Sequence, residues 1–271
     1  MRHWALLDTK KILRLGPAHP PPIPSGQLAM DPLPQEIIDE IIDNLPRSSL
    51  RSASLVAKRW RARSQQRAFR DIWFMSASQV DCWDTKIQGH SGVSSYVRSV
   101  GFSSITDPWD SALFGRVFNF NFSSLTKLTI AGTGCLEGIP EYVSHGGVGG
   151  RITILNLHRM RCSLSVIMST ILAFPNLRDL TVFDITIMSR EEPSTRSILS
   201  QRRPLESLLI HEYGNGAVAK ALAYHQFASR RLTLDAQPPN IQKILAFSSA
   251  TVVELVLVGV YSSCGRPQDR K

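Results

Sequence analysis

Cysteine and histidine are the residues through which this chain could bind a metal or attack a substrate, and their spacing argues against both. The seven histidines include no HExxH motif and no Cys/His cluster. The four cysteines contain no CxxC pair and lie far apart, at Cys82, Cys135, Cys162 and Cys264. Such cysteines are typical of reduced intracellular thiols that pack as small apolar residues. The sequence therefore predicts no metal site and no cofactor.

The glycine and serine motifs of catalytic sites are missing or misplaced. The glycine-rich segment HGGVGGR at 145–151 precedes a predicted strand, whereas a phosphate-binding loop must open a helix. No GxSxG motif occurs. The segment HEY at 211–213 follows a predicted strand and is interpreted as a loop. We therefore expect no catalytic residue, and predict that the chain is not an enzyme.

The net charge of +9 is concentrated in one short part of the chain. Residues 31–46 carry five acidic side chains and no basic one, and residues 47–70 carry eight basic side chains and no acidic one. The 201 residues after position 70 sum to only +3. Because these 201 residues lack an extended positive face, we expect no nucleic-acid partner for the molecule as a whole. No segment has the roughly 18 uninterrupted apolar residues that a membrane span needs, so no membrane partner is expected either.

The acidic and basic segments together have the pattern of three short helices. Asp31 and Pro32 suit an N-cap and a first helical position. The first helix should carry one apolar stripe and end before Pro46, with the stripe at Ile37, Ile38, Ile41, Ile42 and Leu45. Ser48 or Ser49 should cap a second short helix with Leu50 and Ala53, and a third carries Leu55, Val56 and Trp60 among basic residues.

From residue 97 onwards a different pattern recurs, apolar-x-x-apolar-x-apolar. Seven copies begin 28, 27, 25, 28, 24 and 23 residues apart, starting at Val97, Leu125, Ile152, Leu177, Leu205, Ser229 and Val252. Segments with helical spacing lie between them, which is the period of leucine-rich repeats. The asparagine or cysteine expected after the third apolar position is replaced by Thr133, Met160, Ile185 and Tyr213. The predicted fold class is α+β or α/β: a three-helix unit followed by an irregular leucine-rich-repeat-like solenoid of short parallel strands and helices, in preference to a closed barrel.

The predicted units have the following boundaries. Residues 1–30, which include GPAHPPPIPSG, form a disordered proline-rich lead. The three-helix unit spans 31–74, a linker spans 75–94, and the repeats span 95–271. No closing helix follows the last repeat, although solenoids need a polar cap. We expect either that the chain is truncated at its C-terminus or that another element covers the last repeat.

The segment from Leu33 to Phe69 resembles an F-box. The resemblance rests on the LPQEIIDEII opening, Leu50, the SLVAKRW core and the closing FRDIWF, about 40 of the 271 residues. It implies a substrate-recognition adaptor of an SCF-type ubiquitin ligase, in which the F-box docks on a Skp-type adaptor of a cullin–RING complex. The repeats would then bind an unknown protein substrate inside the cell, in the cytoplasm or nucleus. The docking residues that the resemblance implies are Leu33, Pro34, Ile37, Ile38, Ile41, Leu45, Leu50, Leu55, Val56 and Trp60.

Two other interpretations remain open from the sequence. The basic segment 47–70 could bind nucleic acid in the manner of a helix-turn-helix, although Leu55, Val56 and Trp60 interrupt any polar reading face. Alternatively, the chain could be a repeat scaffold whose F-box does not dock. Four arginines near predicted strand ends could contact a phosphate on a target, namely Arg159, Arg161, Arg178 and Arg190.

Overall fold

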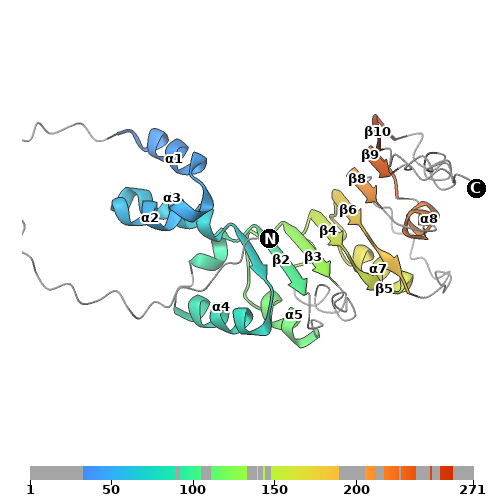
Figure 1. Ribbon diagram of the computed structural model, residues 1–271, viewed down its shortest axis with the longest axis horizontal. Coiled ribbons are helices and arrows are strands. Elements are labelled where there is room, and N and C mark those ends of the chain that lie inside the picture. The colour runs from blue at the N-terminus through green and yellow to red at the C-terminus, as the bar shows by residue number, and fades with distance from the viewer. Residues whose placement is uncertain are drawn as a thin grey trace, which may run out of the picture.

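The structure is a computed structural model of the whole chain. It describes residues 33–89, 92–104, 111–132, 139, 143, 148–188, 205–211, 217–225, 227–235, 245 and 251–258. Within these residues a group of helices comes first and a parallel sheet with helices on one face follows (Figure 1). This order confirms the predicted fold class. The proline-rich lead lies outside the described residues.

The first part consists of α1 (Gln35–Asn44), the 3-10 turn η2 (Arg47–Ser49), α2 (Leu50–Val56) and α3 (Lys58–Phe69). The N-cap of α1 is Pro34, which has no side chain that can cap, and the predicted pair Asp31 and Pro32 lies outside the described residues. Leu45 is extended because Pro46 follows it, so α1 ends where the sequence predicted. Ser49 takes the N-cap position of α2 without a capping hydrogen bond from its side chain.

The sheet has eight parallel strands whose spatial order follows the chain. They are β1 (Asp71–Phe74), β2 (Ser99–Ser104), β3 (Lys127–Gly132), β4 (Ile154–His158), β6 (Asp179–Phe183), β8 (Leu205–His211), β9 (Ser229–Asp235) and β10 (Glu254–Val258). All seven predicted repeats supply one strand each, and β1 adds a strand that the sequence pattern did not predict. A second sheet pairs β5 (Arg161–Cys162) with β7 (Thr186–Ile187).

Helices cover one face of the sheet and leave the other face open (Figure 1). They are α4 (Ala77–Gly89), α5 (Ser111–Phe118), α7 (Leu164–Leu172) and α8 (Ala217–Tyr224), with a 3-10 turn η3 (Val93–Tyr96). The linker predicted over 75–94 therefore contains a helix and a turn. Val80 of α4 is fully buried, and the Trp83 ring meets Phe69 and Phe74 edge to face, at centroid distances of 5.7 and 6.3 Å. Its apolar spacing, Val80, Trp83 and Ile87, is that of a packed helix.

A repeated hydrogen-bond pattern keeps the strands in register. The carbonyl before each strand accepts the amides of two successive residues at the start of the next strand. These carbonyls belong to Arg70, Arg98, Thr126, Thr153 and Arg178, with N···O distances between 2.7 and 3.1 Å. Arg70 directly follows α3, so the three-helix part continues into the sheet without an intervening linker.

The core lies between the sheet and its helices. The second and third apolar positions of the repeats face the helices, and Leu128, Leu155, Leu180, Leu208 and Leu232 are at most 1% exposed. The exception is the last strand, where Leu255 is 41% and Leu257 is 51% exposed. Because neighbouring strands and helices bury a repeat, β10 is the least covered part of the described core.

On the open face, the ring of Trp73 lies directly over Gly101, its partner on β2. A Cβ atom added to Gly101 would lie 2.5 Å from Cδ2 of the indole ring. We therefore predict that Gly101→Ala destabilises the protein by about 1–3 kcal/mol, as overpacking does, by displacing Trp73.

A double-mutant cycle in urea unfolding tests this prediction. In a Trp73→Ala background the ring is gone, so Gly101→Ala should be neutral or slightly stabilising, because alanine restricts the unfolded chain. An equal cost in both backgrounds would show that the indole is not the reason for glycine at this position.

Candidate functional site

Helix α1 presents two apolar faces. Ile38 and Ile42 are at most 1% exposed and form a small core with Leu50 of α2. The neighbouring residues Ile37 and Ile41 are 43% and 37% exposed. The stripe that the sequence predicts is therefore divided, with one isoleucine of each pair inside the unit and the other in solvent.

The exposed isoleucines belong to a larger apolar surface. Leu33, Leu55 and Val56 are 52%, 75% and 66% exposed, and Pro34 is also exposed. The side-chain amide of Gln35 donates to the Arg59 carbonyl at 3.4 Å. This contact places the start of α1 and the turn between α2 and α3 at the same end of the unit. We call this surface the apolar end, formed by Leu33, Pro34, Ile37, Ile41, Leu55 and Val56.

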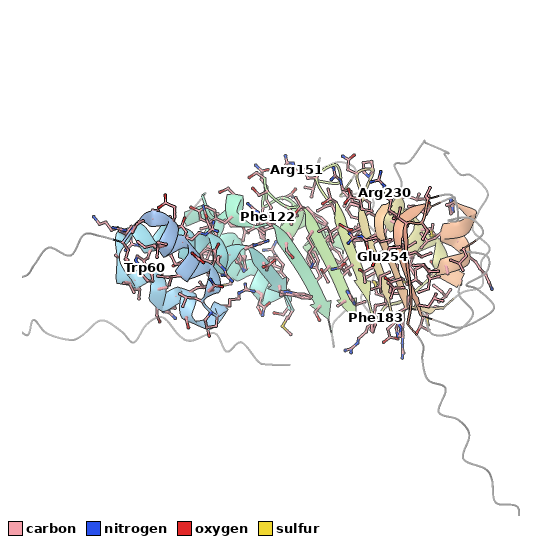
Figure 2. The ribbon with its side chains drawn as sticks, turned by 90° about the horizontal axis from the view of Figure 1, so that it is seen from above. Trp60, Phe122, Arg151, Phe183, Arg230 and Glu254 are labelled. Carbon is pink, nitrogen blue, oxygen red and sulfur yellow. The ribbon has the colours of Figure 1, made fainter. Side chains whose placement is uncertain are left out.

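Four of the ten predicted docking residues lie elsewhere. Ile38 and Leu50 are buried, and Leu45 and Trp60 are partly buried against them. A side chain enclosed in its own core cannot contact a partner, so Ile38 and Leu50 support the surface from behind. Trp60 lies within the three-helix part (Figure 2), where it packs against the core and only part of it remains accessible.

Three of the eight basic residues in 47–70 hold the helices together. Arg63 on α3 forms an ion pair with Asp43 on α1. The Arg67 guanidinium donates to the Ile42 carbonyl at 3.1 Å, and Arg47 donates to the carbonyls of Ala68, at 3.2 Å, and Asp71. No ion pair or side-chain hydrogen bond is recorded for the other five among the described residues, namely Arg51, Lys58, Arg59, Arg61 and Arg70. The opposite charges of the two segments therefore join α1 to α3 only in part.

The ion pair changes the titration of its carboxylate. A hydrogen bond from Arg63 lowers the pKa of Asp43 below its ordinary value. Burial opposes this change, and the charges of Arg63, Arg67 and Arg70 add to it. A depressed pKa stabilises the folded state above the unfolded pKa, and the contribution is lost as pH falls through the folded value.

We predict that Asp43→Asn costs about 0.5 kcal/mol at pH 7, because solvent screens this exposed pair, and costs nothing once Asp43 is protonated in both states. Urea unfolding of both proteins between neutral and strongly acid pH measures the difference. A cost that persists after protonation would mean that the carboxylate contributes through packing alone.

The open face of the sheet is a second candidate surface. At the strand ends, the rings of His158, Phe183 and His211 form a row across β4, β6 and β8. The Phe183 and His211 rings are stacked at 4.5 Å between centroids, and the His158 ring is tilted against Phe183 at 5.8 Å. At the strand starts, Arg178 contacts Glu206 at 3.4 Å and Arg231 contacts Asp179 at 3.9 Å. Figure 2 shows Arg151 and Arg230 along one edge of the sheet and Phe183 along the other.

Burial shifts the pKa values of two groups on this face, His158 and Asp179. Burial lowers the pKa of His158, and the charges of Lys127 and Arg159 lower it further. Burial also raises the pKa of Asp179, together with the charge of Glu206, while Arg231 and Arg178 oppose the change. The imidazole of His158 is therefore neutral at pH 7, in surroundings that are positive on balance.

The arginines that the sequence singled out do not form one cluster. Arg159 and Arg161 lie after β4 and Arg178 lies before β6, whereas Arg190 is outside the described residues. Of the glycine-rich segment, residues 148–151 are described, and they precede β4 rather than a helix. Within the described residues, no three His, Cys, Asp or Glu side chains could together hold a metal ion, and no helix is long and apolar enough to cross a membrane.

Comparison with known proteins concerns the three-helix part of the chain. The model of the F-box domain family matches residues 30–71, which include the apolar end and the three helices. The chain carries an F-box domain. No curated protein matches the chain. The F-box match ends at Asp71, where β1 begins, so most of β1 belongs to the sheet and not to the predicted F-box of 31–74.

An F-box domain implies an SCF adaptor role in general. F-box domains generally bind Skp-type adaptors, and F-box proteins are typically intracellular adaptors without enzymatic activity. Sequence reasoning found this domain through its motif residues. It missed the division of the α1 stripe, although the two isoleucine pairs were a signal for it. It also missed the row of rings, although positions 158, 183 and 211 each lie six residues after the start of their repeat.

Proposed function

We propose that this protein is the substrate-recognition adaptor of an SCF-type cullin–RING ubiquitin ligase. The F-box would dock on a Skp-type adaptor through the apolar end, and the leucine-rich-repeat-like sheet would hold a target protein. Ubiquitin transfer would be carried out by the other subunits. The observation that supports docking most directly is the exposure of Leu33, Ile37, Ile41, Leu55 and Val56 on one small helical unit.

The size of the F-box explains why such exposure favours a partner. A unit of about 40 residues buries too little apolar surface to be very stable by itself, and contiguous exposed apolar surface marks interaction sites. The core of this F-box is small, with Ile38, Ile42 and Leu50 at its centre. Exposed cations at Arg51, Lys58 and Arg61 lie near the apolar end in sequence, where they would orient an acidic partner and raise the association rate.

Co-expression with a Skp-type adaptor tests the proposal. The whole chain should co-purify with the adaptor, and Leu55→Glu/Val56→Glu should abolish co-purification, because both side chains are more than half exposed and would have to be desolvated on docking. The matched control is Ser48→Glu/Ser52→Glu, which adds the same charge at exposed polar positions of η2 and α2 and should leave the complex intact.

The alternatives have distinct outcomes in the same experiment. A chain that is folded and monodisperse but never co-purifies with the adaptor would be a scaffold with a non-docking F-box. Binding of duplex DNA that weakens steeply with salt would favour the helix-turn-helix interpretation. Against that interpretation, Arg47, Arg63 and Arg67 are already engaged with carbonyls or a carboxylate of the same chain.

A further inference from the structure

The open face of the sheet is divided into rows, because the strands are parallel and in register. The residue that begins each strand on this face forms one row, and several of its members are charged: Asp71, Lys127, Asp179, Arg231 and Glu254. The next row is uncharged and includes Trp73, Gly101, Thr129, Asn156, Thr181 and Leu209. The third row contains His158, Phe183 and His211, which we call the ring ladder.

Charges are balanced on one half of the face and unbalanced on the other. Towards β6, β8 and β9, the carboxylates Asp179 and Glu206 are engaged by Arg231 and Arg178. Lys127 begins β3 on this face, and the exposed Arg98 and Arg151 come one and three residues before β2 and β4. Among the described residues, none of these three side chains forms an ion pair. Neighbouring strands lie about 4.8 Å apart, so these three cations lie within a span that one short segment can cover. We call them the basic edge.

The ring ladder adds a second element of recognition. The Phe183 and His211 rings are nearly parallel, at 13°, and His158 lies beyond the other side of Phe183. Because the faces of Phe183 and His211 are directed at each other, a ligand would meet Phe183 at its ring edge. Ring edges carry partial positive charge and attract the face of another aromatic ring.

These features favour a peptide over a nucleic acid as the ligand of the open face. Single-stranded nucleic acids bind by stacking bases on free ring faces, and the ring of His211 already covers one face of Phe183. The carboxylates of Asp71 and Glu254 on the same face would repel a continuous phosphate backbone. An extended peptide can instead place separate acidic side chains at the basic edge and keep a neutral backbone near these carboxylates.

We propose that the target segment held by the open face is acidic and contains an aromatic residue. Its carboxylates contact the basic edge at Arg98, Lys127 and Arg151. Its aromatic side chain packs on the ring ladder, against the ring edge of Phe183. The strand starts and strand ends of β4 are about four residues apart, roughly 13 Å, which an extended peptide crosses within a few residues. This proposal rests on the proposed function, since it specifies the class of target that the adaptor would select.

Fluorescence anisotropy on the whole chain in complex with its Skp-type adaptor tests the proposal. The probe is a labelled short peptide of alternating glutamate and tyrosine, compared with glutamate–alanine and lysine–tyrosine peptides and with oligothymidine. The glutamate–tyrosine peptide should bind most tightly. Lys127→Glu should weaken its binding at least about tenfold, as loss and reversal of an interfacial charge do. The matched control Lys220→Glu, on the exposed side of α8, should leave its affinity unchanged.

A second pair of measurements isolates the ring ladder. Phe183→Leu should weaken the glutamate–tyrosine peptide and leave the glutamate–alanine peptide unaffected. Equal binding of the glutamate–tyrosine and lysine–tyrosine peptides, equal effects of the Lys127 and Lys220 variants, or preferential binding of oligothymidine would overturn the proposal. Co-purification with the adaptor distinguishes failure of this inference from failure of the proposed function. If the complex forms, negative peptide results count against this inference alone. If the wild-type chain does not bind the adaptor, the result counts against the proposed function.

Discussion

Leu155→Ala is expected to lower the free energy of unfolding by about 3 kcal/mol, within the range for a leucine truncated in a closed core. Leu155 is fully buried on β4, between Leu128 on β3 and Leu180 on β6. Parallel strands on both sides and the helix layer below limit how far the neighbours can move into the space left. The cost therefore includes a cavity in addition to the lost transfer free energy.

The matched control is the same substitution at the equivalent position of the last repeat. Leu255 is 41% exposed, so Leu255→Ala removes less buried surface and leaves an opening that water can fill; we expect a cost below about 1.5 kcal/mol. Urea unfolding followed by circular dichroism measures both values. Equal costs would mean that β10 is covered in solution and that its core is as closed as that of β4.

The second large effect concerns the two faces of α1. Ile37→Asp/Ile41→Asp is expected to weaken adaptor binding at least about a hundredfold, since two side chains central to an apolar interface each contribute about 2 kcal/mol or more in a hot spot. Both residues are exposed in the free chain, so the free energy of unfolding should change by less than about 0.5 kcal/mol.

Ile38→Ala/Ile42→Ala is the comparison that distinguishes docking from folding. Both side chains are at most 1% exposed, so this variant should unfold the F-box at lower urea concentration. Adaptor affinity by titration calorimetry and unfolding by circular dichroism are measured on all variants. Retained affinity in the Ile37/Ile41 variant would place docking on another surface of the F-box.

The strand positions of the sheet were predictable because a repeat imposes the same local pattern many times. Each copy of apolar-x-x-apolar-x-apolar from Val97 onwards became a strand, even where Ser229 replaces the first apolar residue. The segment 75–94, which the sequence predicted as a linker, contains α4 and η3, and its apolar spacing at Val80, Trp83 and Ile87 occurs only once. A single weak pattern without a repeated neighbour is hard to distinguish from a loop.

The F-box shows which features of a site the sequence pattern can predict and which it cannot. Its motif residues identified the domain, and its composition gave the charge of each segment. The expected pairing of acidic α1 with basic α3 occurs as the ion pair between Asp43 and Arg63. The pattern did not tell Ile37 from Ile38, or an arginine that binds a carbonyl from one that faces solvent. These distinctions depend on which helix lies against which face, as when α2 brings Leu50 against Ile38.

The sequence by itself determined the domain type, the number of predicted repeats and the location of the charge, because these depend on residue type and spacing along the chain. Three features depend on tertiary structure: Ile37 and Ile41 are exposed, Leu255 is less covered than Leu155, and the rings of His158, Phe183 and His211 contact one another. The physical reason is that exposure and ring contact are properties of neighbours in space. The ring neighbours are 25 and 28 positions apart along the chain, and the register of parallel strands brings them together. On α1, the packing of α2 against one face decides which isoleucines are buried.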